Sequence, residues 1–424
     1  MLALRPDCDT VMAMPPPSTD GPDLAAIEAA RVRLAGVVQE TPCAFSRTLS
    51  DMTRTRCWMK LENQQMTGSF KERGAANLLL QLGLDERRRG VIAASAGNHG
   101  LAVAHHAAKL GIPAVIVMPE WAPLVKVTSA RRNGAEVILF GGSFDDAYDH
   151  AAEIGAARGL VFVHPFDDER IIAGQGTIGL ELLEQRPDVD AIIVPVGGGG
   201  LAGGVGVAVK SRRPSIRVVG VQTDALPSMQ RALSDGRPVR LDPATTIADG
   251  IAVREVRART LALARAYVDE LVTVSEEELA RAVLLLVEIE KTVVEGAGAA
   301  PLAALLNRDL GLEGRTVVIV LSGGNIDVTM LARIFERGLV KDGRLVRLAV
   351  LLRDRPGALA RLAALVAEER ANVVHIEHDR AFARWTAIGE TEVAITLETS
   401  GRDHIDRLLA RLRGAGYRVD EQGS

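Results

Sequence analysis

Three glycine-rich segments stand where a protein could bind an anion. They are residues 95–100 (SAGNHG), 197–204 (GGGGLAGG) and 322–325 (SGGN), and each follows an apolar run expected to form a strand. In the second segment, four glycines precede Leu201 and an expected helix, so backbone N–H groups can approach an anion at the positive end of that helix. The strand–loop–helix context favours a ligand site over a merely flexible loop.

The features that these loops lack narrow the choice of anion. No Lys-Ser or Lys-Thr pair follows the glycines, which disfavours a nucleotide phosphate loop. A dinucleotide site needs an acidic residue after the next strand, but the run at 217–221 is followed by Gln222. The pattern favours a single phosphate, such as that of pyridoxal 5′-phosphate (PLP), whose aldehyde requires an amine.

The candidate amine is Lys71, in the segment LENQQMTGSFKERGA at 61–75. Thr67, Gly68 and Ser69 form a polar turn that caps the helix expected to follow, so local packing could hold the lysine in place. An arbitrary lysine most often lies on the surface, and its type alone does not mark Lys71 as functional.

Apolar runs indicate the elements that must position these residues. The runs are VIAAS (91–95), AVIVM (114–118), EVILF (136–140), VFV (161–163), AIIVPV (191–196), RVVGV (217–221) and TVVIVLS (316–322). They lack polar alternation and are separated by helix-length segments, which predicts an α/β fold with parallel sheets covered on both faces. Ligands bind such sheets at the carboxyl ends of the strands.

The rest of the chain predicts a second domain. Strands are expected at 345–352, 372–379, 391–399 and 417–420, with helices at 357–369 and 402–413. This β-α-β-β-α-β order is the ferredoxin-like split motif. The expected organisation is a disordered leader at 1–20, a catalytic region at 21–336 whose smaller lobe at about 52–160 is inserted in a larger lobe, a linker at 337–344 and a domain at 345–424.

Composition excludes several classes of protein. The 424 residues carry a formal net charge of −4, which disfavours nucleic-acid binding. Three widely spaced cysteines provide neither a disulfide framework nor a CxxC site, which favours a reducing compartment. Because no apolar run approaches the ~20 residues that span a bilayer, and no signal peptide is recognisable, we expect a cytoplasmic protein without membrane contact.

The motifs together resemble a known family. LENQQMTGSFKERGA, SAGNHG, HPFDDERIIAGQGTIGLE (164–181), VGGGGLAGG, VEGAGAA (294–300) and SGGN follow the order found in PLP enzymes of fold type II. From about residue 23 to residue 424, the chain resembles the threonine ammonia-lyase (threonine dehydratase) family with one C-terminal ACT domain, an amino-acid-sensing module.

The resemblance implies roles for matching residues. Lys71 would bind the cofactor covalently and act in catalysis together with Ser69. The residues that would contact PLP are Phe70, Lys71, Asn98, Gly197, Gly198, Gly199, Gly200, Leu201 and Ser322. The substrate carboxylate would lie among Ser69, Ser95, Gly97, Asn98 and His99. From the residues alone, Ser322 could be an ordinary turn, His99 a packed polar residue, and Glu295 either a site residue or a structural one.

Three positions bear on the chemistry. A neutral hydroxyl at Ser322, facing the pyridine nitrogen as the resemblance implies, would favour elimination of a β-substituent over a long-lived carbanion. Leu101 replaces a glutamine that is common in relatives and could alter packing or substrate preference. Gln222 replaces the glutamate of relatives with a divalent-cation site, and since an amide is a poor hard-cation ligand we predict no metal there.

The resemblance implies a lyase that converts L-threonine to 2-oxobutanoate and ammonia and also acts on L-serine. One alternative is a serine racemase, or a dehydratase for threo-3-hydroxyaspartate or phenylserine. A non-catalytic amino-acid sensor is another, against which the joint presence of Lys71, Asn98 and Ser322 argues.

The ACT resemblance further implies a homodimer or homotetramer and an amino-acid effector, with isoleucine or valine favoured. The effector would lie near Asn372 and the first strand-to-helix turn, which comprises Asp354, Arg355, Pro356, Gly357, Ala358 and Leu359. A domain that only oligomerises is the alternative.

Overall fold

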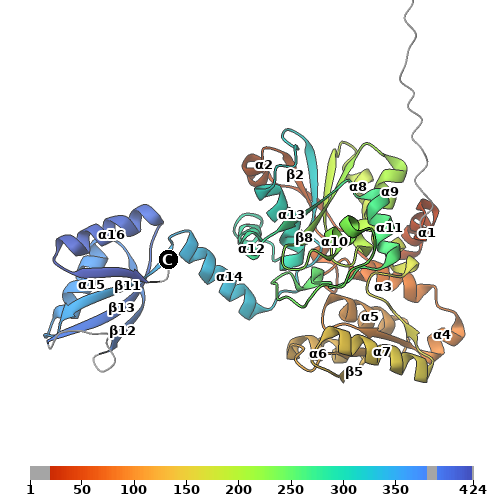
Figure 1. The fold of residues 1–424 in the computed structure, drawn as a ribbon, viewed down its shortest axis with the longest axis horizontal. Helices are drawn as coiled ribbons and strands as arrows, with labels where there is room; N and C mark the ends of the chain where they lie inside the picture. The colour runs from red at the N-terminus through yellow and green to blue at the C-terminus, as the bar shows by residue number, and fades with distance from the viewer. Residues whose placement is uncertain (1–19, 380–388, 423–424) are drawn as a thin grey trace, which may run out of the picture. The chain divides into compact units, whose positions relative to one another are not determined.

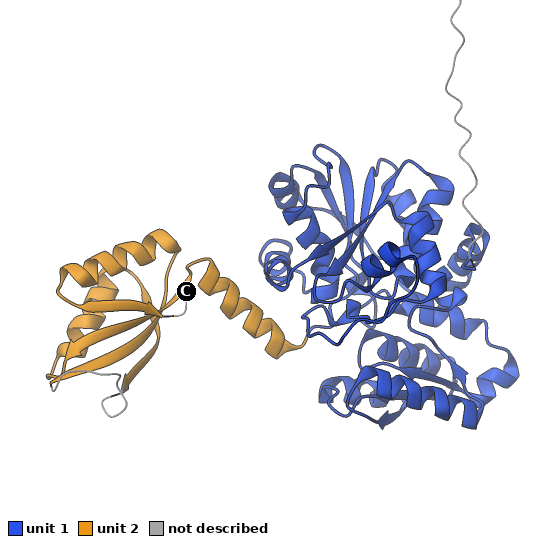
Figure 2. Ribbon diagram, in the orientation of Figure 1, with its two compact units in different colours: residues 1–326 blue, residues 327–424 orange. Residues whose placement is uncertain are grey.

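The computed structural model describes residues 20–379 and 389–422. The chain divides into two compact units, residues 1–326 and residues 327–424 (Figure 2). The expected leader lies outside the described residues, apart from Asp20. In the described part, no helix has both the length and the apolar character needed to span a membrane.

Unit 1 contains two sheets. The larger has the strand order β1-β2-β10-β7-β8-β9 and the smaller β5-β4-β3-β6, and every pairing is parallel except that of β1 with β2. The strands are β1 (Cys43–Phe45), β2 (Arg56–Lys60), β3 (Val91–Ala94), β4 (Ala114–Met118), β5 (Glu136–Leu139), β6 (Val161–Phe162), β7 (Ala191–Pro195), β8 (Arg217–Thr223), β9 (Glu270–Val274) and β10 (Thr316–Val320). The expected α/β fold with parallel sheets is therefore confirmed.

Helices cover both faces of these sheets (Figure 1). They are α1 (Leu24–Leu34), α2 (Arg47–Thr53), η1 (Glu62–Gln64), α3 (Lys71–Leu80), α4 (Leu84–Arg89), α5 (Asn98–Lys109), α6 (Leu124–Arg132), α7 (Phe144–Arg158), α8 (Glu169–Gln185), α9 (Gly200–Arg212), α10 (Ser228–Asp235), η2 (Asp249–Ile251), α11 (Ala258–Tyr267), α12 (Glu276–Glu290) and α13 (Gly296–Asn307). In β3, Val91 and Ala93 pack in the cluster that includes α5, whereas Ile92 and Ala94 pack against α7. Burial on both faces explains why the strand lacks polar alternation.

The smaller lobe differs from the expected range. The strand β2 lies within the expected 52–160, yet it pairs with β10 in the larger sheet, from Arg56↔Thr316 to Lys60↔Val320. The strands of the smaller sheet run only from β3 to β6. The sequence missed β1, β2 and β9 because these strands are short or mix polar with apolar residues.

The linker expected at 337–344 is largely helical. The helix α14 (Val328–Lys341) continues through Gly338, at a cost of about 1 kcal/mol for glycine in a helix. Asp327 caps its start, and Gly343, with a φ of +66°, follows its end. The division between the units therefore falls before α14.

Unit 2 contains the predicted split motif. Its sheet order is β12-β13-β11-β14, and every pairing is antiparallel. After α14 the elements are β11 (Leu345–Arg353), α15 (Ala358–Glu368), β12 (Asn372–Asp379), β13 (Glu390–Glu398), α16 (Arg402–Gly414) and β14 (Arg418–Gln422). The hydrophobic core of unit 2 includes residues of both helices and the fully buried Val393, Ile395 and Leu397 of β13. Every second residue of this strand thus faces the core, as expected for a sheet with one covered face.

Candidate active site

A cavity of about 760 Å³ in unit 1 is lined by residues of both lobes. Twelve of the predicted site residues line it: Phe70, Lys71, Ser95, Gly97, Asn98, His99, Gly197, Gly198, Gly199, Gly200, Leu201 and Ser322. The strands that precede these loops are parallel, so their carboxyl ends bring distant segments of sequence together. Ser69 is buried beside the cavity, where it forms an isolated antiparallel bridge with Gly323.

Lys71 is the first residue of α3 and extends along the cavity wall. Its Nζ donates a hydrogen bond to the Pro165 carbonyl at 2.8 Å and lies 5.2 Å from the centre of the Phe70 ring. Burial lowers the pKa of Lys71 to about 8, although the carboxyl of Glu295 opposes this shift. A substantial fraction of this amine is therefore neutral, and so nucleophilic, near physiological pH.

A buried set of charges holds the helix that carries Lys71. Arg73 lies on the same helix, and its Nη2 is 2.8 Å from Glu62 Oε1, while its Nη1 is 2.5 Å from Glu181 Oε1. Glu181 also accepts from Lys60 at 2.5 Å, and all four side chains are at most 8% exposed. The sequence did not identify these residues, because lysine, arginine and glutamate are usually exposed.

The glycine segment at 197–200 leads directly into α9. Gly199, with a φ of +92°, caps the helix, and the N–H groups of the first turn have no partner within the helix. A Cβ on Gly198 would overlap the ring of Phe166, and a Cβ on Gly199 would lie 2.5 Å from Met229 Cε. Only glycine therefore gives a phosphate close access to this backbone.

Asn98 begins α5 and contacts a residue that the sequence left undecided. Its Nδ2 donates to Glu295 at 2.8 Å to Oε1 and 3.1 Å to Oε2. Glu295 is buried and lines the cavity, so it belongs to the site. Burial, followed by the charge of Asp249, raises the pKa of Glu295 to about 7.

Two histidines in the cavity wall are neutral at ordinary pH. Burial, and then the charge of Lys71, lowers the pKa of His99 to about 3, and its Nε2 lies 2.8 Å from the Val163 carbonyl. Burial also lowers the pKa of His164 to about 3. Its Nδ1 accepts from the N–H of Asp167 at 2.7 Å. Both histidines are therefore better suited to hold neighbouring backbone groups by hydrogen bonds than to transfer protons. Of the two, the sequence analysis named only His99.

Two serines lie near Lys71: Ser322 lines the cavity, and Ser69 is fully buried. Ser322 follows β10, and its carbonyl accepts from the Phe70 N–H at 3.0 Å. Among the described residues, the buried Ser69 Oγ lacks a hydrogen-bond partner. An orphaned hydroxyl, a glycine cradle and a lysine with a lowered pKa together fit PLP.

The two departures from the family pattern differ in their packing, because the buried Gln222 Nε2 has no hydrogen-bond partner among the described residues. Gln222 is fully buried at the end of β8, and its Oε1 accepts from the Gln230 N–H at 2.9 Å. Leu101 lies on α5, and its N–H donates to the Gly97 carbonyl. Within the described ranges, no three His, Cys, Asp or Glu residues cluster as a metal site would require.

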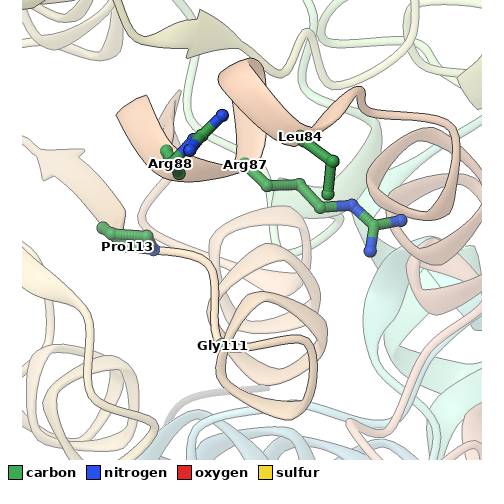
Figure 3. Close-up of a pocket in the computed structure, with 5 residues that line it drawn as sticks. All are labelled: Leu84, Arg87, Arg88, Gly111 and Pro113. Carbon is green, nitrogen blue, oxygen red and sulfur yellow. The ribbon is translucent and has the colours of Figure 1, made fainter.

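A second, shallow hollow in the smaller lobe is lined by Leu84, Arg87, Arg88, Gly111 and Pro113 (Figure 3). Arg87 donates to the carbonyls of Leu80 and Leu82 at 3.0 Å each, and Arg88 pairs with Asp85 at 2.6 Å. These hydrogen bonds and this ion pair account for the positions of both arginine side chains without a ligand in the hollow.

In unit 2, the residues expected around an effector do not converge within one chain. The turn 354–359 follows the last residue of β11, whereas Asn372 pairs with Glu398, which in turn pairs with Leu345 at the start of β11. Asn372 therefore lies at the opposite end of the sheet, because β12 runs parallel to β11.

Comparisons with known proteins agree with this geometry. Residues 34–323 match the family model described as pyridoxal-phosphate dependent enzyme, and residues 342–416 match that of the ACT domain. The L-threonine ammonia-lyase of Thermotoga maritima is 50% identical over 93% of this chain and 98% of its own.

Two solved structures share the fold of unit 1. The processed form of threonine deaminase isoform 2 from Solanum lycopersicum has a TM-score of 0.70 and 34% identity, covering 76% of this chain and 98% of its own. Maize serine racemase has a TM-score of 0.71 and 34% identity, covering 75% of this chain and 98% of its own.

The lowered pKa of Lys71 predicts how the cofactor-free protein reacts with an aldehyde. The neutral amine is the reactive form, so reaction should be half-maximal near pH 8 and fall as the pH drops below that value. Trapping with borohydride, followed by peptide mass spectrometry at several pH values, measures this profile. A midpoint near 10, as for an exposed lysine, would contradict it.

Substitution of Gly198 by alanine should weaken cofactor binding. The added Cβ must displace the loop or Phe166, and we expect the dissociation constant for PLP to rise about tenfold. Titration of the cofactor-free protein, followed by visible absorbance, measures the change. Gly414→Ala, where a Cβ would meet open space, is the matched control and should bind as wild type does.

Proposed function

The chain belongs to the family of pyridoxal-phosphate dependent enzymes, and on this basis we propose that it is an L-threonine ammonia-lyase. The net reaction converts L-threonine to 2-oxobutanoate and ammonia, and L-serine to pyruvate and ammonia. The observation that carries the proposal is that the Lys71 amine faces the same cavity as the glycine loop, Asn98 and Ser322.

The cavity residues divide the binding of PLP among them. The N–H groups of Gly197, Gly198, Gly199, Gly200 and Leu201 would hold the phosphate at the start of α9. Asn98 would donate to the ring hydroxyl, Phe70 would lie against the ring, and the Ser322 hydroxyl would face the pyridine nitrogen without a formal charge. When bound, PLP withdraws electrons from the α-carbon of an amino acid joined to its aldehyde.

Lys71 holds the cofactor and then serves as the base. When not bonded to the cofactor, Lys71 Nζ would accept the proton from the substrate α-carbon, and a pKa near 8 leaves enough neutral amine for this role. The substrate hydroxyl would then leave the β-carbon as water with the proton that Lys71 accepted, and the released enamine would take up a water and lose ammonia to give the 2-oxo acid.

The loop that carries Asn98 binds the substrate carboxylate. Asn98 and His99 begin α5, where backbone N–H groups and the positive helix end favour an anion, while the Gly97 N–H donates to Ser95 Oγ at 3.1 Å. Ser69 and Ser95 add hydroxyl donors. His99 contributes a neutral ring that orients the loop, since its lowered pKa of about 3 keeps the ring uncharged at ordinary pH.

Unit 2 gives the enzyme a means of regulation by an amino acid. We propose that a branched-chain amino acid binds at the turn 354–359 and changes activity in a cytoplasmic homo-oligomer. The match of residues 342–416 to the ACT domain supports this assignment.

Replacing Lys71 by alanine should abolish the reaction. Without the amine, the visible absorbance of the lysine-bound cofactor should disappear and kcat for threonine should fall at least about a thousandfold. Spectra and a coupled assay for 2-oxobutanoate measure both. The assignment of threonine would be wrong if kcat/KM were higher for threo-3-hydroxyaspartate or phenylserine than for threonine. It would also be wrong if L-serine gave mainly D-serine.

An effect of isoleucine or valine on threonine kinetics should depend on unit 2. Gly357 has a φ of +83° at the start of α15, so Gly357→Val strains the turn and leaves the residues of unit 1 unchanged. We expect the wild type to change its threonine KM with either amino acid, and the variant to lose that response. An unchanged response in a folded variant would contradict the proposed effector site.

A further inference from the structure

Three side chains form a continuous hydrogen-bonded relay, and two of them, Asn98 and Glu295, line the cavity. Asn325 Nδ2 donates to the Thr67 carbonyl at 2.7 Å and to Asn98 Oδ1 at 2.8 Å, and Asn98 Nδ2 donates to Glu295. The relay joins the turn before Lys71, the start of α5, the segment after β10 and the start of α13. It therefore ties the two lobes together at the site.

The relay fixes the orientation of each amide. The Thr67 carbonyl can only accept, so the Asn325 atom that faces it must be Nδ2. The Asn98 atom that faces the same nitrogen must then be Oδ1, which turns Asn98 Nδ2 toward Glu295. Residue 295 has to accept a hydrogen bond, because otherwise a polar group would be left unpaired in a buried position.

Glycines leave room for this arrangement. A Cβ on Gly68 would lie 2.6 Å from Asn325 Oδ1, and a Cβ on Gly323 would overlap Glu295 and lie 3.1 Å from Asn98 Nδ2. A Cβ on Gly250 would lie 3.2 Å from Glu295 Oε1. Glycines on three separate loops thus permit contacts with the relay that a larger residue would block.

We propose that Glu295 is a positioning residue for the cofactor: it accepts from Asn98 and so holds the Asn98 amide with its N–H side available to the ring hydroxyl. Asn98 Nδ2 has two hydrogens and can serve Glu295 with one and a ligand with the other. This inference rests on the proposed function, which places PLP in the cavity.

The acceptor, not the negative charge, is the required property. Glu295 is 4% exposed and faces Asp249 on η2, Lys126 on α6 and Lys71 on α3. Its pKa is raised to about 7, so it alternates between carboxylate and neutral acid near physiological pH. The carboxylate accepts through either oxygen, whereas glutamine accepts through one oxygen at every pH.

A matched pair of variants tests the proposal. Glu295→Gln keeps the acceptor, and Glu295→Met keeps the length of the side chain but offers only a weakly accepting sulfur. We expect the PLP dissociation constant to stay within about threefold of wild type for E295Q and to rise at least about tenfold for E295M. Tenfold corresponds to about 1.4 kcal/mol, within the range for hydrogen bonds to charged groups.

A variant at the other end of the relay provides independent evidence. Asn325→Asp keeps the shape but removes both donors, so Asn98 loses its fixed orientation. We expect N325D to weaken PLP binding in the same direction as E295M. If E295M does not fold, N325D and E295Q decide the question. Glu313→Gln, at an exposed surface ion pair, is the control that should behave as wild type.

The outcomes separate this inference from the proposed function. Titration of the cofactor-free proteins by visible absorbance gives PLP affinity, and an assay with threonine gives kcat and KM. If the wild type neither binds PLP nor releases 2-oxobutanoate, the proposed function fails. If the wild type does both, but E295M and N325D bind PLP within twofold of wild type, or E295Q is as weak as E295M, only the role of Glu295 is overturned.

Discussion

The buried ion pairs of Arg73 are the interaction on which the position of the catalytic lysine depends. Arg73 follows Lys71 by two residues on α3, and its guanidinium binds Glu62 in η1 and Glu181 on α8. Removing one partner of such a set leaves a buried charge without compensation, which costs about 3–5 kcal/mol. The attraction among these charges lowers the pKa of Glu62 despite its full burial. These contacts tolerate little displacement, so they hold the helix that carries Lys71 against α8. Because the helix is held, the backbone of Lys71 is fixed relative to the cavity.

A second constraint is the close approach of backbones around the cavity. Gly198 packs against the Phe166 ring, Gly204 against the Ile172 carbonyl and Gly298 against the Gly323 backbone. Each of these three glycines makes a contact that a Cβ would prevent, which accounts for part of the 41 glycines in the chain. The same closeness leaves the N–H groups at the start of α9 accessible to a phosphate.

The sequence predicted most of the architecture, because apolar runs buried on both faces carry a strong signal. The run AVIVM became β4 without change, and the C-terminal split motif was found with small shifts at its ends. The short, mixed strands such as β2 were missed, because a residue such as Lys60 reads as exposed when its partner Glu181 is distant in sequence. The roles of Glu295 and Asn325 could not be predicted for the same reason. Their hydrogen bonds join four segments that are distant in sequence and meet only in the folded chain. Local motifs could therefore locate the anion site but not the side chains that orient it.

The electrostatics of the cavity explain why its charged groups depart from their usual pKa values. Burial lowers the pKa of Lys71 and raises that of Glu295, and their mutual attraction offsets only part of either shift. Both groups consequently change protonation near neutral pH. The two histidines stay neutral, whereas the rest of the cavity wall carries charges of both signs: the cations Lys126, Arg240, Arg254 and Arg257, and the acidic residues Asp145, Asp149, Asp249 and Glu255. At the glycine loop, backbone dipoles at the start of α9 would stabilise an anionic phosphate, and the Lys71 amine would be left free to exchange protons with a substrate.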